Sequence, residues 1–298
     1  METYFSELKK SVSENSYNQY ARIYKLLGIK TTEDIGDHRL IWAKIEDKSA
    51  NTRKNYLAAL VKLLRMMPTN DTNTELIKIY TEKMNKEIEN TKPTQEYNEK
   101  QKANLMSMAE IDNIRDTMLE GIRPSEFTNK VNYNLLTDHL ILCLYTMMPP
   151  RRNEFYDMRI ATKAGDLDDT HNWLLWSKGK KEFVLSRYKT AKTYGVQREA
   201  IPPALQKVIA NYLKYRGEIA LSDNDRLLVR YGNQNLENSN DITRTLNRIL
   251  KKKIGASMLR HIYLTEKYGK VIKMMSADAD ALGHSVEQQR EYIKNPTK

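Results

Sequence analysis

Cysteine and long apolar runs are nearly absent from this sequence, and each absence excludes a class of protein. Cys143 is the single cysteine among 298 residues, so an intrachain disulfide and a cysteine-based zinc cluster are both excluded. No apolar run reaches the roughly 18 to 20 residues that a bilayer-spanning helix needs, and the polar N-terminus is unlike a signal peptide. We therefore expect no membrane partner and a reducing compartment, the cytoplasm or the nucleus.

Positive charge is what the chain has in excess. It carries 49 Lys and Arg residues against 38 Asp and Glu residues, a formal net charge of +11. Such an excess favours binding to a polyanion, because each neutralised phosphate releases counterions. DNA fits this charge, and so, on charge alone, do RNA and acidic membrane surfaces.

Apolar spacing and turn residues divide the chain into two parts. Apolar residues recur at helical spacing through residues 1–90, which predicts a helical domain. Residues 91–104 are polar, include Pro93 and have no apolar periodicity, as is typical of a linker. A capping box at Ser107 and Glu110 then opens a second domain, expected at 105–298. The helices expected in the first domain lie at about 17–27, 37–45, 49–67 and 75–89.

The second domain mixes both periodicities. The apolar run from Leu135 to Met148, which contains Cys143, predicts a buried helix, and further helices are expected after Pro203 and from Asp241 to Lys253. Three short runs bounded by Gly and Lys-rich turns predict strands at 173–176, 182–186 and 196–201. The expected fold class is α+β, mostly α with a small antiparallel sheet.

The sequence contains a set of residues whose chemistry suits attack on a phosphate: two arginines, a histidine and a tyrosine. Arg151 follows Pro149-Pro150, which end the preceding helix, and a second helix opening near Arg151 would offer free backbone donors. Arg260, His284 and Tyr292 follow near the C-terminus. Arginine clamps phosphate oxygens bidentately, histidine can donate to them, and a phenolic oxygen can attack phosphorus without a metal. Each residue alone has a plainer explanation, a solvated arginine pair or a packing tyrosine.

Taken together, four ordered segments resemble the tyrosine recombinase (integrase) family. Arg151-Arg152-Asn153-Glu154 is similar to the family's first box, and Met258-Leu259-Arg260-His261 is similar to its second. The third box is matched by Leu282-Gly283-His284-Ser285 followed by Tyr292. Tyr188-Lys189-Thr190 stands where the family carries its catalytic lysine on a β-hairpin.

The resemblance implies site-specific DNA recombination or integration through a 3′-phosphotyrosyl intermediate, with neither metal nor cofactor. It makes Tyr292 the nucleophile, with Arg151, Arg260 and His284 stabilising the phosphoryl oxygens. Lys189 would protonate the departing 5′ oxygen, and Lys192 is its rival for this role.

Two positions depart from the family pattern. Most members carry His or Lys where this chain has Ser257, so Ser257 acting through water, Lys253 and His261 remain alternatives for proton relay. The interval from His284 to Tyr292 is one residue shorter than usual. These departures keep open a catalytically inactive DNA-binding relative, and the shared chemistry keeps open a type IB topoisomerase.

The resemblance also implies that the partner is double-stranded DNA, bound by a homo-tetramer, with the N-terminal domain clasping one side of the duplex. Glu154, three residues after Arg151, is expected to orient the Arg151 guanidinium. Basic side chains near the predicted strands and helices are expected to hold phosphates or read bases. These DNA-contact candidates are Arg53, Lys54, Lys178, Lys180, Lys192, Arg244 and Arg248.

Overall fold

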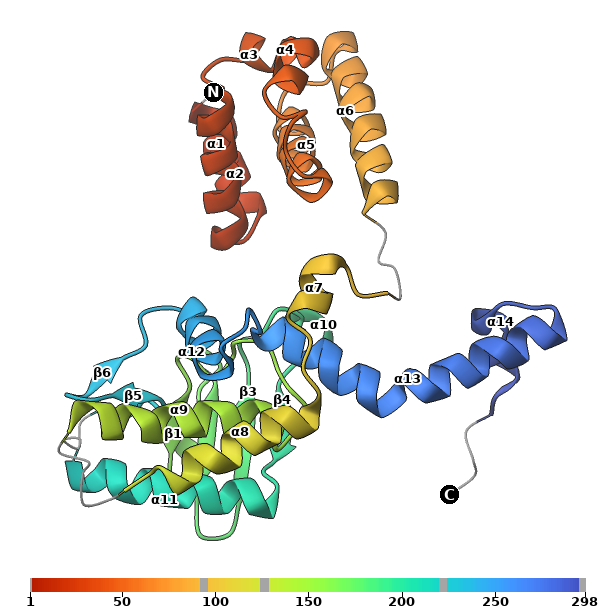
Figure 1. Cartoon of the computed structure of the whole chain (residues 1–298). Coiled ribbons are helices and arrows are strands. Elements are labelled where there is room, and N and C mark those ends of the chain that lie inside the picture. The colour runs from red at the N-terminus through yellow and green to blue at the C-terminus, as the bar shows by residue number, and fades with distance from the viewer. Residues whose placement is uncertain (1, 92–95, 124–128, 220–223, 295–298) are drawn as a thin grey trace. The chain divides into compact units, whose positions relative to one another are not determined.

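The protein is mostly helical, with 61% of its residues in helices and a small mixed sheet of 4 strands. This computed structural model describes residues 2–91, 96–123, 129–219 and 224–294 (Figure 1). The expected α+β class is confirmed. The chain divides into two compact units, Met1–Glu96 and Tyr97–Lys298.

The first unit is an all-helical bundle built around α5. Its core comprises Leu57, Leu60 and Leu64 of α5 together with apolar residues of its neighbours. The hydroxyl groups of Tyr24 and Tyr80 donate to backbone carbonyls across this core, both at 2.8 Å. The helices are α1 (Glu2–Ser11), α2 (Glu14–Leu27), α3 (Glu33–Gly36), α4 (His38–Ala43), α5 (Ala50–Leu64) and α6 (Asp71–Asn90).

Local signals explain where these helices begin and end. The Ser49 side chain caps α5 by accepting from the Thr52 N–H, and α2 ends at Gly28 with φ 74°. The four expected helices are therefore present as α2, α4, α5 and α6. The short helices α1 and α3 were not expected, because each carries too few apolar positions to show a period.

The second unit surrounds helix α9, whose central residues from Leu140 to Tyr145 are all 0% exposed. Cys143 lies in this stretch, as expected for a core cysteine. Helix α7 falls within the stretch expected to be a structureless linker, because Asn98 and Gln101 form a reciprocal capping box there. The helices are α7 (Glu99–Ala103), α8 (Met108–Glu120), α9 (Lys130–Thr146), α10 (Ala191–Tyr194), α11 (Pro203–Ile219), α12 (Asn240–Leu250), α13 (Ala256–Leu282) and α14 (Val286–Tyr292).

A four-stranded sheet in the order β1-β2-β3-β4 packs in the same unit. The three expected strands are present and pair antiparallel, but a fourth strand, β1, pairs with β2 in parallel, so the sheet is mixed and not purely antiparallel. A three-residue strand offers too short a pattern to be predicted. The strands are β1 (Arg159–Ala161), β2 (Trp173–Trp176), β3 (Lys181–Leu185) and β4 (Gln197–Ala200), and β5 (Val229–Arg230) pairs with β6 (Gln234–Asn235) separately.

Helix α13 is unusual for its length and exposure. Its first two turns are anchored in the core by Met258, Leu259 and Ile262, and the helix then continues away from the rest of the second unit (Figure 1). Its 27 residues span about 40 Å at 1.5 Å per residue. Gly283, with φ 70°, ends it, and α14 folds back against it. Among the described residues, no helix is long and apolar enough to cross a membrane.

Candidate active site

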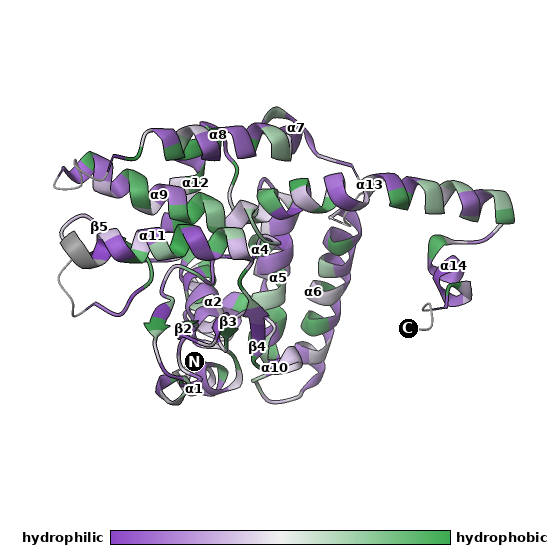
Figure 2. Ribbon diagram, turned by 90° about the horizontal axis from the view of Figure 1, so that it is seen from below, coloured by the Kyte–Doolittle hydropathy of each residue, from purple (hydrophilic) through white to green (hydrophobic). Residues whose placement is uncertain are grey.

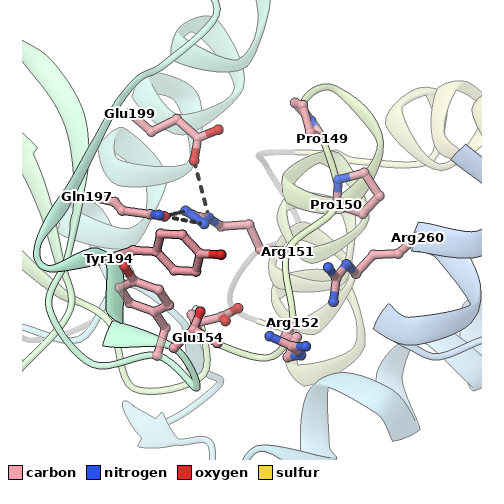
Figure 3. A pocket seen from close by; sticks show the side chains of 11 residues that line it. Pro149, Pro150, Arg151, Arg152, Glu154, Tyr194, Gln197, Glu199 and Arg260 are labelled. Carbon is pink, nitrogen blue, oxygen red and sulfur yellow. Dashed lines mark hydrogen bonds and ion pairs between the residues drawn. The ribbon is translucent and has the colours of Figure 1, made fainter. Parts of the chain in front are cut away.

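The turn that follows α9 forms one wall of an open pocket of about 290 Å³ (Figure 3). Residues from the turn, from the segment between β3 and β4, and from α13 meet there. The lining residues are Pro149, Pro150, Arg151, Arg152, Glu154, Tyr188, Thr190, Tyr194, Gln197, Glu199 and Arg260. The pocket thus gathers parts of the first box, the second box and the lysine segment.

The backbone at Arg151 is not the helix start that the prolines suggested. Residues 151–158 form an irregular turn, because Phe155 and Met158 are drawn into the core and the chain enters β1 at Arg159 directly afterwards. Tyr145 fixes the turn by donating its hydroxyl hydrogen to the Arg152 carbonyl at 2.5 Å. Burial raises the pKa of Tyr145 well above its ordinary value, so this hydroxyl stays a donor.

Strand β4 holds the Arg151 side chain. The Arg151 Nε donates to Glu199 Oε2 at 3.2 Å, while Nη1 and Nη2 donate to Gln197 Oε1 at 3.1 and 2.5 Å. Gln197 and Glu199 are two residues apart on a strand, so their side chains share a face. Three of the five guanidinium N–H donors are used in this way, which leaves two for a ligand.

Gln197 and Glu199 were not foreseen from the sequence. Glu154 was expected to orient Arg151, yet the contacts of that guanidinium come from β4. No alternation of polar and apolar residues marks the pair, because Gln197, Arg198 and Glu199 are all polar. Glu154 does line the pocket, and its Oε2 is buried with no hydrogen-bond partner among the described residues.

Arg260 reaches the same pocket from the opposite side (Figure 3). It lies in the second turn of α13, directly after the buried Leu259, so core packing fixes the helix that carries it. The start of α13 also packs closely against α12. A Cβ at Gly255 would approach Thr243 Cγ2 to 3.0 Å, so only glycine fits there without a shift of its neighbour. Two guanidinium groups from distant parts of the chain therefore face one cavity.

The lysine segment is a turn between β3 and β4, as expected. Tyr188 and Thr190 line the pocket, and Lys189 between them is exposed. The buried Asn172 ties this segment to the first box: its Nδ2 donates to the Glu154 carbonyl at 3.2 Å and to the Arg187 carbonyl at 2.9 Å. One side chain thus couples the position of Lys189 to that of Arg151.

His284 and Tyr292 lie together but away from this pocket. Their ring centroids are 5.8 Å apart, Tyr292 is 69% exposed, and His284 Nε2 is buried with no partner among the described residues. The helical residues from Arg260 to Leu282 separate the two places by about 33 Å. Neither side chain lines the arginine pocket.

The remaining candidate residues differ in whether their side chains are free in solvent or already paired within the protein. Ser257 and Lys192 are exposed, and Lys178 lies exposed in the turn between β2 and β3. Lys180 pairs with Glu182 at 3.1 Å and stays 60% exposed. Arg248 binds Asp138 at 2.7 Å and is likewise 60% exposed.

Arg53 is the DNA-contact candidate whose side chain is most fully engaged in hydrogen bonds within the protein. Its Nε and Nη2 bind the two carboxylate oxygens of Glu87 at 2.9 and 2.8 Å, and its Nη1 donates to the carbonyls of Glu46 and Lys48. The neighbouring Lys54 is half-buried. Arg244 binds Asp241 and has a 63% exposed side chain.

No protein-family model matches this chain, and no curated protein matches it.

Proposed function

We propose that this protein cleaves and rejoins DNA strands through a covalent 3′-phosphotyrosyl bond, as a site-specific recombinase of the tyrosine recombinase class. The observation that carries the proposal is the shared pocket of Arg151 and Arg260. Two guanidinium groups around one open cavity suit the non-bridging oxygens of a phosphodiester, whose charge grows in the transition state.

The chemistry divides among a few side chains. The Tyr292 phenol loses its proton to water as its oxygen attacks phosphorus, the bond from phosphorus to the 5′ oxygen breaks, and Lys189 gives that oxygen a proton. Arg151, Arg260 and His284 stabilise the phosphoryl oxygens, which requires that His284 and Tyr292 be brought to the arginine pocket that they do not line in this structure. Rejoining reverses these steps, so the energy of the broken bond is kept in the covalent intermediate.

Duplex binding is assigned to exposed basic side chains of the second unit. Lys189 and Lys192 are exposed on the segment between β3 and β4, Lys178 is exposed in the turn between β2 and β3, and Arg244 and Arg248 are exposed on α12. These contacts position the DNA backbone, and assembly of a homo-tetramer on two DNA sites would bring the strands together.

A second function, duplex binding without cleavage, is favoured by one observation. His284 and Tyr292 lie beyond the far end of α13, whose residues from Arg260 to Leu282 span about 33 Å. A protein that kept this arrangement on DNA would bind with a steep salt dependence and leave the strands intact.

The direct test is incubation with a nicked suicide duplex in EDTA. We expect a covalent protein–DNA adduct from the parent protein and none from Tyr292→Phe. A parent protein that binds the duplex without forming an adduct supports the second function, and equal adduct from Tyr292→Phe removes Tyr292 as nucleophile.

A further inference from the structure

The arginine pocket contains a tyrosine whose hydroxyl group is free. Tyr194 lines the pocket together with Arg151 and Arg260, and its side chain points into the pocket from the side of Gln197 (Figure 3). Tyr194 is 67% exposed, and its hydroxyl group has no hydrogen-bond partner among the described residues. A phenol can donate one hydrogen bond, so this group is available to whatever ligand the two guanidinium groups attract.

The turn that carries Tyr194 is held closed by hydrogen bonds. Tyr194 ends the short helix α10, and its N–H donates to the Thr190 carbonyl at 3.1 Å. Gly195 follows with φ 66°, a conformation that favours glycine, and its carbonyl accepts from the Tyr188 hydroxyl at 2.7 Å. The two tyrosines of this turn therefore differ in role, because Tyr188 fixes the turn and Tyr194 projects from it.

Two hydroxyl groups of the pocket are free among the described residues, those of Thr190 and Tyr194. The hydroxyl group of Tyr188 is engaged in closing the turn. Thr190 is half-buried, whereas Tyr194 is exposed. His284, which the proposed function assigns to the phosphate, does not line the pocket in this structure. Tyr194 is therefore the hydroxyl donor that a ligand between the arginines meets most readily.

We propose that the Tyr194 hydroxyl group donates a hydrogen bond to a non-bridging oxygen of a phosphate bound between Arg151 and Arg260. Three segments then contribute donors to one phosphate, namely the turn after α9, helix α10 and helix α13. Such a bond strengthens as negative charge grows on the oxygen in the transition state, which makes Tyr194 a catalytic residue. The role in strand cleavage rests on the proposed function, but the contact with a bound phosphate does not.

Orthovanadate tests the contact without DNA and without Tyr292, because vanadate can adopt the five-coordinate geometry of a phosphoryl transition state. Tyr194→Phe should weaken vanadate binding roughly 10-fold in calorimetric titrations, since one hydrogen bond to a charged group is lost. Tyr268→Phe is the matched control and should leave the affinity unchanged. Its hydroxyl group does not line the pocket and lies on the part of α13 that extends away from the rest of the second unit (Figure 2). Equal affinities in the parent and Tyr194→Phe, or no binding by the parent that Arg151→Ala abolishes, overturn the contact.

A modified scissile phosphate tests the role of Tyr194 in cleavage. Tyr194→Phe should slow adduct formation on an ordinary duplex about 100-fold, near the lower limit for the loss of one preorganised donor, because water can enter the open pocket. A methylphosphonate replaces one non-bridging oxygen by a methyl group and exists as two diastereomers. The parent and Tyr194→Phe should react equally fast with the diastereomer that lacks the oxygen bound by Tyr194, and the difference should remain with the other. The same rate ratio with both diastereomers overturns a direct contact.

The remaining outcomes separate this proposal from the proposed function. A parent protein that binds vanadate with the help of Tyr194 but forms no adduct keeps the contact and removes the proposed function. Full adduct formation by Tyr194→Phe keeps the proposed function and removes Tyr194 from the cleavage step. If Tyr194→Leu then loses activity, the ring and not the hydroxyl group meets the DNA, which also overturns the proposal.

Discussion

Arg151 and Arg260 lie more than one hundred positions apart in the sequence and line one pocket. Arg151 is held by β4 and Arg260 by the anchored start of α13, so the two charges are positioned by separate parts of one core. Because β4 and the start of α13 act independently, mutations can separate the positioning of Arg151 from that of Arg260.

The contacts from β4 to Arg151 give the first prediction. Gln197→Ala removes two hydrogen bonds to the guanidinium and leaves the charge in place. We expect adduct formation to slow on the order of 10-fold, well short of the roughly 100- to 1,000-fold expected for Arg151→Ala, because Gln197 acts only through Arg151. Glu120→Gln, at the exposed end of α8, is the control. A loss with Gln197→Ala as large as with Arg151→Ala would contradict a positioning role.

Lys189 and Lys192 can be separated by a leaving-group experiment. Both are exposed, but Lys189 stands between two residues that line the pocket. Lys189→Ala should reduce cleavage of an ordinary duplex about 100-fold, and a 5′-thiol leaving group, which needs no proton, should restore the rate. Lys192→Ala should change duplex binding, but it should leave unchanged the ratio of the cleavage rates with the 5′-thiol and the ordinary leaving group. Rescue of Lys192→Ala, and not of Lys189→Ala, would reverse the assignment.

The N-terminal unit yields a prediction about two neighbouring basic residues. Arg53 binds both oxygens of the nearly buried Glu87, so Arg53→Lys, which loses the planar fork, should lower the thermal midpoint of unfolding. Lys54→Ala should leave that midpoint unchanged and weaken duplex binding, with a shallower salt dependence. Calorimetry and binding titrations at several salt concentrations check both. An unchanged midpoint in Arg53→Lys would show that the Glu87 contact contributes nothing to stability.

Acid sensitivity of the second unit should depend on His139. Burial lowers the pKa of His139 to about 4, with the Arg115 charge adding to the effect. The unfolded chain takes up the proton near pH 6.5 and the folded chain only near pH 4, so stability is present above 6.5 and falls as the pH drops between these values. The loss is on the order of 3 kcal/mol.

Denaturant titrations across this pH range check the assignment. His139→Met should flatten the dependence, and the exposed-site variant His261→Gln should keep it. An unchanged slope in His139→Met would show that other groups cause the acid sensitivity.

Periodic segments were the most predictable part of the fold. The buried helix around Cys143 and the strands near Trp173, Phe183 and Arg198 appear where their patterns placed them. Strand β1 and the turn after Arg151 did not, because both depend on which residues the core draws inward, as Phe155 and Met158 show.

The candidate site was predictable only in part, for a similar reason. The order of the motifs predicted that Arg151 and Arg260 act on the same phosphate, and both residues line one pocket. The partners Gln197, Glu199 and Asn172 carry no local signal, since their roles arise from tertiary contacts. The position of Tyr292 follows from the unbroken course of α13 to Leu282, which motif spacing does not specify.

Peptide mapping of the covalent adduct tests the central claim most directly. Trypsin cuts after Arg290 and Lys294, so attack by Tyr292 predicts that the nucleotide is found on the tetrapeptide Glu291–Lys294. The bond should be a phosphotyrosine to a 3′ end, and Arg151→Ala and Arg260→Ala should each greatly reduce its yield. Nucleotide on any other peptide, or a duplex that stays uncleaved while bound, would contradict the account.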